Sequence, residues 1–223
     1  MQKKYVFFAI MLVGVLVLSG CTNKSDKNEE MGLEQPEDQK FEYDYADVRK
    51  YLTDHISEYA PEDPVLGGTW YVTDIRFEEN KNRALIDYED GHIAVKAIVD
   101  YRIESNNTVW VSAIPAYFDD REPVKVKVGD RFAIALSANP STGFSWIGED
   151  AENSSRPLSR MESGFISDAS EQDIALSMTG IGGINYIIYD AVNSGAEKIK
   201  LTYQRPWESV QPLETKIFNV TVE

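Results

Sequence analysis

The sequence has 223 residues and a formal net charge of −15, and its composition limits what the protein can be. Its 43% of hydrophobic and 11% of aromatic residues are enough to fill the cores of one or two small domains. The excess of acidic residues argues against nucleic acid as a partner, because contacts with phosphates need clustered Lys and Arg. A single cysteine excludes an intramolecular disulfide, so apolar cores alone must hold the folded part together.

The amino terminus has the layout of a secretory signal peptide. Two lysines precede an apolar run over residues 5–18, which is shorter than the roughly 20 residues of a membrane-spanning helix. The run ends in Leu-Ser-Gly-Cys at Cys21, a pattern that resembles the lipobox of prokaryotic lipoproteins. The resemblance implies removal of residues 1–20, lipid on Cys21, and a protein anchored to the cell membrane on its extracytoplasmic side. The alternative is a lone cysteine behind an ordinary signal or anchor helix.

The two segments that follow differ in kind. Residues 21–40 are polar and charged with almost no apolar side chains, which predicts a disordered tether. Residues 41–118 predict a small α+β domain, to which the pattern assigns no role. Apolar residues at three- to four-residue spacing over 45–59 predict an amphipathic helix, which Pro61 ends. Alternating segments then predict a four-stranded antiparallel sheet, with strands at residues 69–77, 83–88, 92–103 and 108–114.

Residues 119–223 predict an all-β, immunoglobulin-like sandwich. They carry no helical pattern and many short alternating segments separated by turn residues. The apolar positions of the expected strands are Val124, Val126, Val128, Phe132, Ile134, Leu136, Phe144, Trp146, Ile174, Leu176, Met178, Tyr186, Ile188, Ile199, Leu201, Tyr203, Phe218, Val220 and Val222. Alternate connections of a sandwich gather at one end, so loops between these strand pairs are expected to form one composite edge.

Three loop sequences lie between the expected strand pairs. They are Asn139, Pro140, Ser141, Thr142, Gly143 and Phe144 in the first loop; Gly180, Ile181, Gly182 and Gly183 in the second; and Arg205, Pro206 and Trp207 in the third. Pro140 fixes its own φ and Gly143 allows a conformation closed to other residues, so the first loop is expected to be stiff. The glycines of the second loop permit close approach of its backbone to another surface. Arg and Trp are enriched at binding hot spots, although Trp207 could instead be a core residue at a strand end.

The order and content of these loops resemble the chagasin family of cysteine protease inhibitors. The resemblance implies an immunoglobulin-like sandwich whose three loops occlude the active-site cleft of a papain-like cysteine protease. By the same resemblance, residues 139–144 would lie across the catalytic cysteine and histidine of the protease, residues 180–183 would make a second contact, and Trp207 would pack beside the cleft. Ser141 stands where the best-known members carry threonine. The alternative is a sandwich of the same descent that no longer inhibits and serves as an adhesion or scaffolding module.

The inventory of reactive residues argues against an enzyme. The two histidines, His55 and His92, have no metal-ligand partners at a credible spacing. No Gly-x-Ser-x-Gly or His-Glu-x-x-His sequence is present, and the second loop lacks the Lys-Ser/Thr ending of a phosphate-binding loop. The sequence therefore predicts no catalytic residue, no metal and no cofactor.

Overall fold

The computed structural model describes residues 45–78, 81–104, 109–148, 156–170, 172–173 and 176–223, which belong to one compact unit. The expected signal peptide over residues 1–20, the lipidation site Cys21 and the tether over residues 21–40 lie outside the described residues. Within the described ranges, no helix is both long and apolar enough to cross a membrane.

The expected helix over residues 45–59 is present but interrupted. It consists of α1 (Tyr45–Asp54) and α2 (Ile56–Tyr59), and the break lies at His55, whose φ of −114° departs from helical geometry. The apolar stripe predicted for this segment is buried, with Val48 and Leu52 in α1 and Ile56 in α2. Helical structure ends before Pro61, as the missing N–H of proline requires.

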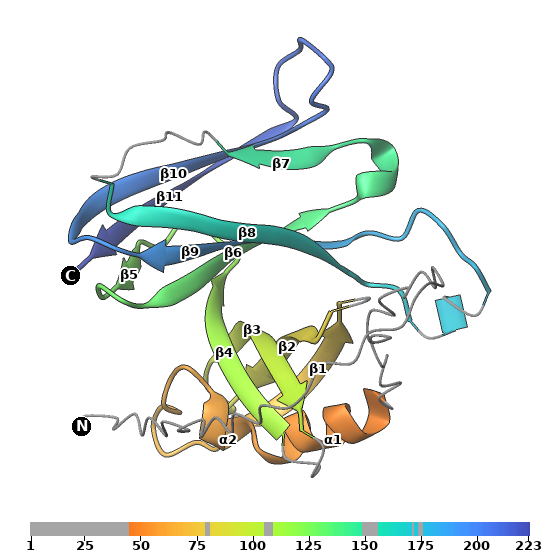
Figure 1. The fold of residues 1–223 in the computed structure, drawn as a ribbon, viewed down its shortest axis with the longest axis vertical. Coiled ribbons are helices and arrows are strands. Elements are labelled where there is room, and N and C mark those ends of the chain that lie inside the picture. Colours follow the sequence, from red (N-terminus) through yellow and green to blue (C-terminus); the bar gives the residue numbers. More distant parts are fainter. Residues whose placement is uncertain (1–44, 79–80, 105–108, 149–155, 171, 174–175) are drawn as a thin grey trace, which may run out of the picture. The chain divides into compact units, whose positions relative to one another are not determined.

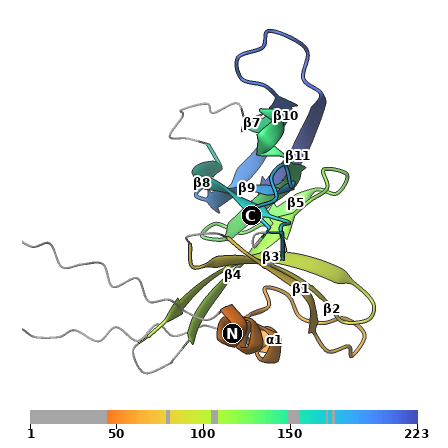
Figure 2. The ribbon, with the colours of Figure 1, turned by 90° about the vertical axis from the view of Figure 1, so that its right-hand side faces the viewer.

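Four antiparallel strands follow the helices in the expected order. They are β1 (Tyr71–Phe77), β2 (Arg83–Glu89), β3 (Ala94–Ile103) and β4 (Val109–Tyr117). Figure 2 shows α1 against one face of this meander. The core between the helices and that face includes Val48, Leu52, Ile56, Trp70, Ile75, Ile86, Tyr88 and Val99. Amphipathic helices cover a sheet face in this way because their apolar stripe must be buried against another element.

The carboxyl-terminal half contains two packed layers. One layer is a four-stranded sheet in the order β5 (Val124–Val126), β11 (Glu214–Val222), β10 (Gly195–Gln204) and β7 (Ser145–Gly148). The facing layer consists of β6 (Arg131–Ala138), β9 (Gly183–Ala191) and β8 (Leu158–Ser167). The core between the layers holds most of the expected apolar positions, among them Val124, Phe132, Ile134, Trp146, Leu201, Phe218 and Val220.

A feature that the sequence did not reveal joins the two halves of the chain. β4 pairs in parallel with β6 at Ala116 and Tyr117, opposite Ala133 and Ile134. The result is a single seven-stranded sheet in the order β1-β2-β3-β4-β6-β9-β8 (Figure 1). A third core lies on the face of this sheet away from the four-stranded layer, and it draws on both halves: Leu85, Ile98, Ile114, Ala133, Ala135, Ile166, Ile184, Tyr186 and Ile188.

A polar network at one end of this third core links the same two regions. The hydroxyl of fully buried Tyr186 donates to Glu78 Oε2 at 2.7 Å and accepts from Arg83 Nη1 at 2.7 Å. Arg83 also pairs with Glu162 Oε1 of β8 at 2.5 Å. Burial and the hydrogen bond to Glu78 raise the pKa of Tyr186, so its hydroxyl stays protonated. Gly164 must be glycine here, because a Cβ would lie 2.3 Å from that hydroxyl.

Two expectations about strand positions are wrong. Val128 is 51% exposed, because β5 ends at Val126 and the chain turns at Gly129, where φ is +93°. No strand precedes the second loop in the described part of residues 172–182, where Leu176 and Met178 are exposed; Ile174 lies outside the described residues. The strand paired with β9 is instead β8, whose register shift between Arg160 and Glu162 disrupts the alternation that would have marked it in the sequence.

Candidate functional site

The first loop (residues 139–144) is held by its own hydrogen bonds. It contains a short 3₁₀ helix, η1 (Pro140–Thr142), for which Asn139 is the cap: Asn139 Oδ1 accepts from the Ser141 amide at 3.2 Å and from its hydroxyl at 2.6 Å. Thr142 Oγ1 donates to the Asn139 carbonyl at 2.6 Å. Gly143 closes the turn in the left-handed region at φ +79°. The predicted stiffness of this loop therefore has a physical basis in local bonds that fix each residue.

The second loop (residues 180–183) lies directly against the first. Asn139 Nδ2 donates to the Gly180 carbonyl at 2.8 Å, so one side chain ties the two loops together. Gly180 has φ +83°, which a residue with a side chain rarely adopts. Gly183 is buried as the first residue of β9, where a Cβ would lie 2.2 Å from the Ile166 carbonyl, so it sets the base of the loop rather than its exposed edge.

The third loop (residues 205–207) contacts the first from the other side. Arg205 Nε donates to the Thr142 carbonyl at 3.0 Å, and its guanidinium lies 4.5 Å from the centroid of the Phe144 ring. Trp207 is 70% exposed, which excludes the core position considered for it. The edge of its ring lies over Gly143, where an added Cβ would come within 2.6 Å of it. Gly143 is thus required by both its backbone conformation and its neighbour.

Tyr203 supports the first loop, a role that the sequence analysis missed. Its hydroxyl accepts from the Asn139 amide at 3.0 Å, and its ring packs on Phe144 and Trp146 with centroids 5.3 Å and 5.1 Å away. The alternation of β10 marked Tyr203 only as an apolar strand position, and nothing in the sequence indicated its polar partner. The three loops consequently form one connected edge with exposed Ser141, Thr142, Pro206 and Trp207 at its surface.

The two histidines lie away from this edge. His55 stacks on Tyr51 with ring centroids 4.1 Å apart, and its Nδ1 lies 2.9 Å from the Tyr51 carbonyl. His92 lies near Asp90, with 3.8 Å between Nδ1 and Oδ1. Among the described residues, no group of three or more His, Cys, Asp or Glu side chains is placed to hold a metal ion.

The three loops lie in a part of the chain that is similar to known proteins. A family model described as chagasin family peptidase inhibitor I42 matches residues 125–222. Amoebiasin-1 of Entamoeba histolytica is 30% identical over 84 residues, which cover 38% of this chain and 74% of that protein. Chagasin of Trypanosoma cruzi is 30% identical over 84 residues, covering 37% of this chain and 71% of the relative.

A solved structure is similar over about half of the chain. The crystal structure of a cysteine protease inhibitor from Entamoeba histolytica aligns at 25% identity and a TM-score of 0.39. The alignment covers 48% of this chain and 96% of the inhibitor. The family match begins at residue 125, so residues 45–118, with both helices and the β1–β4 meander, lie outside it.

Proposed function

Because this chain belongs to the chagasin family of peptidase inhibitors, we propose that it blocks papain-like cysteine proteases by placing its three loops in their active-site cleft. Members of the family are inhibitors and not enzymes, which agrees with the lack of a catalytic motif in the sequence. The observation that carries the proposal is the connected edge itself, in which Asn139 and Arg205 tie the second and third loops to the first.

Stiffness of the first loop explains how such an edge would bind tightly. A loop that is already ordered loses little conformational entropy on association, so more of its contact energy appears as affinity. In residues 139–144 the cap at Asn139, the Thr142 hydroxyl and the Tyr203 hydroxyl supply that order before any protease arrives. The exposed hydroxyls of Ser141 and Thr142 would then lie against the reactive residues without offering a bond in the register of a substrate.

Trp207 would supply the apolar anchor of the contact. It is exposed on a turn whose direction is fixed by Pro206 and whose base is held by the ion pair between Arg205 Nη1 and Glu208 Oε1 at 2.9 Å. Exposed tryptophans in such settings are enriched among residues that dominate binding energy. Glycines at 180 and 182 would let the second loop approach the protease surface closely.

We further propose that Cys21 carries lipid and holds the inhibitor at the extracytoplasmic face of the cell membrane. The proposal is supported by the apolar run and the Leu-Ser-Gly-Cys sequence that ends it. Labelling of producing cells with a radioactive fatty acid tests it, since the wild-type chain is expected to take up label and Cys21→Ala is not.

Titration of papain with the full chain lacking residues 1–20 tests the inhibitory function. We expect stoichiometric loss of hydrolysis of a fluorogenic peptide, with an inhibition constant of roughly nanomolar order, about −12 kcal/mol. If the chain at micromolar concentration inhibits neither papain nor a cathepsin-type protease, the result would contradict the proposal and favour an adhesion or scaffolding role.

The same titration tests the anchor residue. Trp207→Ala is expected to weaken inhibition by about 2 kcal/mol or more, because it removes the exposed aromatic side chain of the third loop. The matched control is Trp110→Ala in β4, where another exposed tryptophan lies on the β1–β4 meander. Equal inhibition by the two variants would contradict the role assigned to the third loop.

A further inference from the structure

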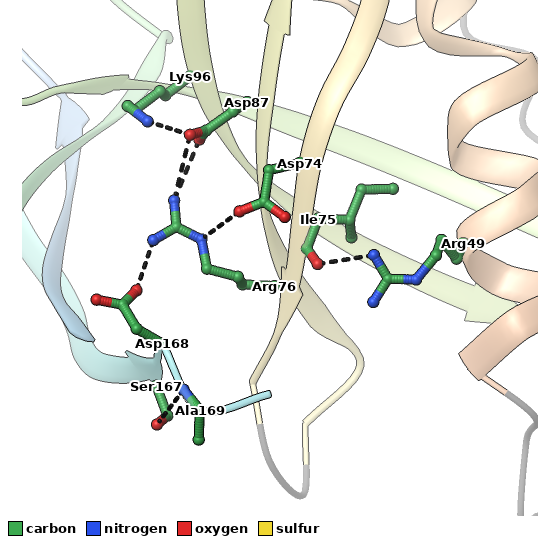
Figure 3. Close-up of polar contacts among 9 residues, drawn as sticks. All are labelled: Arg49, Asp74, Ile75, Arg76, Asp87, Lys96, Ser167, Asp168 and Ala169. Carbon is green, nitrogen blue, oxygen red and sulfur yellow. Dashed lines mark hydrogen bonds and ion pairs between the residues drawn. The ribbon is translucent and has the colours of Figure 1, made fainter. Parts of the chain in front are cut away.

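Arg76 of β1 lies between carboxylates from two distant parts of the chain (Figure 3). Its Nη1 pairs with Asp168 Oδ1 at 2.6 Å, its Nη2 with Asp87 Oδ2 at 3.3 Å, and its Nε with Asp74 Oδ2 at 3.1 Å. Lys96 completes the cluster by pairing with Asp87. The cluster therefore joins β1, one edge of the seven-stranded sheet, to the residue that follows β8, the other edge.

Asp168 stands at the root of the second loop. The ladder between β8 and β9 ends at the pair Ser167 and Gly183, and the Asp168 amide adds one more bond, donating to the Gly182 carbonyl at 3.0 Å. The Ser167 hydroxyl accepts from the Ala169 amide at 3.1 Å and turns the chain away from the strand. Asp168 thus continues the backbone pairing of β8 and β9 by one residue, up to Gly182 of the second loop.

A contact with α1 fixes the backbone next to Arg76. Arg49 of α1 donates from Nη1 to the carbonyl of Ile75 at 2.9 Å (Figure 3). Its guanidinium also lies 5.2 Å from the Phe77 ring centroid. The Arg76 side chain is 21% exposed, so its three ion pairs are partly shielded from water. Burial alone would lower the pKa of Arg76, but the hydrogen bond to Asp168 and the nearby carboxylates raise it, so the charge is permanent.

We propose that the β1–β4 region positions the second loop through Arg76, which makes Arg76 a positioning residue for inhibition. This inference rests on the proposed function of the loops. Without Arg76, the carboxylates of Asp74, Asp87 and Asp168 would face one another with only Lys96 to balance them. Asp168 would then move toward solvent, the bond to Gly182 would open more often, and the loop would lose order that it must regain on binding.

The test compares Arg76→Gln, Asp168→Asn, the double variant and Arg131→Gln in the full chain lacking residues 1–20. Arg131 is the matched control, because its Nε pairs with Asp190 Oδ1 of β9 at 2.8 Å, at the end of β6 away from the first loop. Dissociation from papain is expected to be about tenfold faster than for wild type in both Arg76→Gln and Asp168→Asn. For Arg131→Gln it should lie within about twofold of wild type. The double variant should lie within about twofold of the singles, because both single substitutions remove the ion pair between Arg76 and Asp168.

Hydrogen exchange in the free protein supplies a readout independent of inhibition. The Asp168 amide should exchange about tenfold faster in Arg76→Gln, whereas the Asn139 amide, held by Tyr203, should not change. An unchanged Asp168 amide, or dissociation rates equal to those of Arg131→Gln, would overturn the proposal. If the wild-type chain inhibits neither papain nor a cathepsin-type protease, the proposed function fails, and the exchange rate of the Asp168 amide alone decides whether Arg76 orders the second loop. Asp168→Asn, which alters a half-exposed side chain, serves if Arg76→Gln does not fold.

Discussion

The two sheets of the carboxyl-terminal half are buried in different ways. In β11 of the four-stranded sheet, Phe218, Val220 and Val222 are buried while the residues between them are exposed. In β6 of the seven-stranded sheet, every residue from Phe132 to Leu136 is buried. Alternation marks a sheet with one face in water, and continuous burial marks a sheet covered on both faces.

The cover on the second face of β6 and β9 comes from the amino-terminal region. Leu85, Ile98 and Ile114 of β2, β3 and β4 pack against Ala133 and the other β6 and β9 residues of the third core. The part of the chain that matches the inhibitor family therefore shares a core with a part that does not. The difference between the two sheets teaches that the β1–β4 region covers the face of β6 and β9 that the four-stranded layer leaves open.

Removal of residues 1–118 is expected to have the largest effect. Burial of each large aliphatic side chain contributes about 1.5–3 kcal/mol, so loss of the β2 to β4 side chains would remove stability comparable to the roughly 5–15 kcal/mol of a whole domain. We expect the fragment of residues 119–223 to bind a hydrophobic dye and to unfold without a sharp transition in calorimetry. Residues 42–223 are the control, and a monomeric fragment with a cooperative transition would contradict this account.

A single substitution in the shared core sharpens the comparison. Ile98→Ala should lower the free energy of unfolding by about 2–5 kcal/mol, because Ile98 is fully buried and a cavity would remain. Ile217→Ala, on the solvent face of β11, should change it by about 0.5 kcal/mol or less. Urea denaturation of both variants measures the difference. Equal midpoints would show that the third core contributes no more to stability than the solvent face of β11.

The smallest expected effect depends on pH. The hydrogen bond from Arg83 holds the pKa of Glu162 below its ordinary value of 4.5. A lowered pKa stabilises the folded state above the ordinary value, and this stabilisation is lost as the pH falls through the lowered pKa. Because Glu162 is 42% exposed, we expect Glu162→Gln to cost about 1 kcal/mol or less near neutral pH and nothing once the pH has fallen below the lowered pKa. Parallel stability curves for the two proteins against pH would contradict the assignment.

Regular patterns in the sequence predicted most of the individual elements. The stripe of Val48, Leu52 and Ile56 marked the helices, because one side of each helix is apolar and the other is not. Alternating segments marked β1 to β4, but they did not show that the central residues of β2 and β3 are buried on both faces of the sheet. β8 was missed because its bulge breaks the alternation, and exposed Leu176 and Met178 suggested a strand that the described residues around them do not form. The pairing of β4 with β6 could not be predicted, since it involves only two residues of each strand.

The loops of the candidate site were predictable as sequences but their connections were not. Turn chemistry identified Pro140 and Gly143, and the structure shows η1 and a left-handed glycine at those positions. The bonds from Asn139 to Tyr203, and from Arg76 to Asp168, join residues 64 and 92 positions apart. Local patterns carry no information about contacts of that span, because any strand order that satisfies the alternation would fit them equally well.

The position of β11 has a consequence for how the protein forms during synthesis. This last strand of the described chain lies between β5 and β10, pairing with both, so Val124 has no ladder partner until Val220 has been made. All strands of the seven-stranded sheet, by contrast, have been made by residue 191, before β10 and β11. Until β11 has been made, the face of the sheet that includes Phe132 and Ile134 lacks part of its cover, including Phe218 and Val220, and stays open to chaperones.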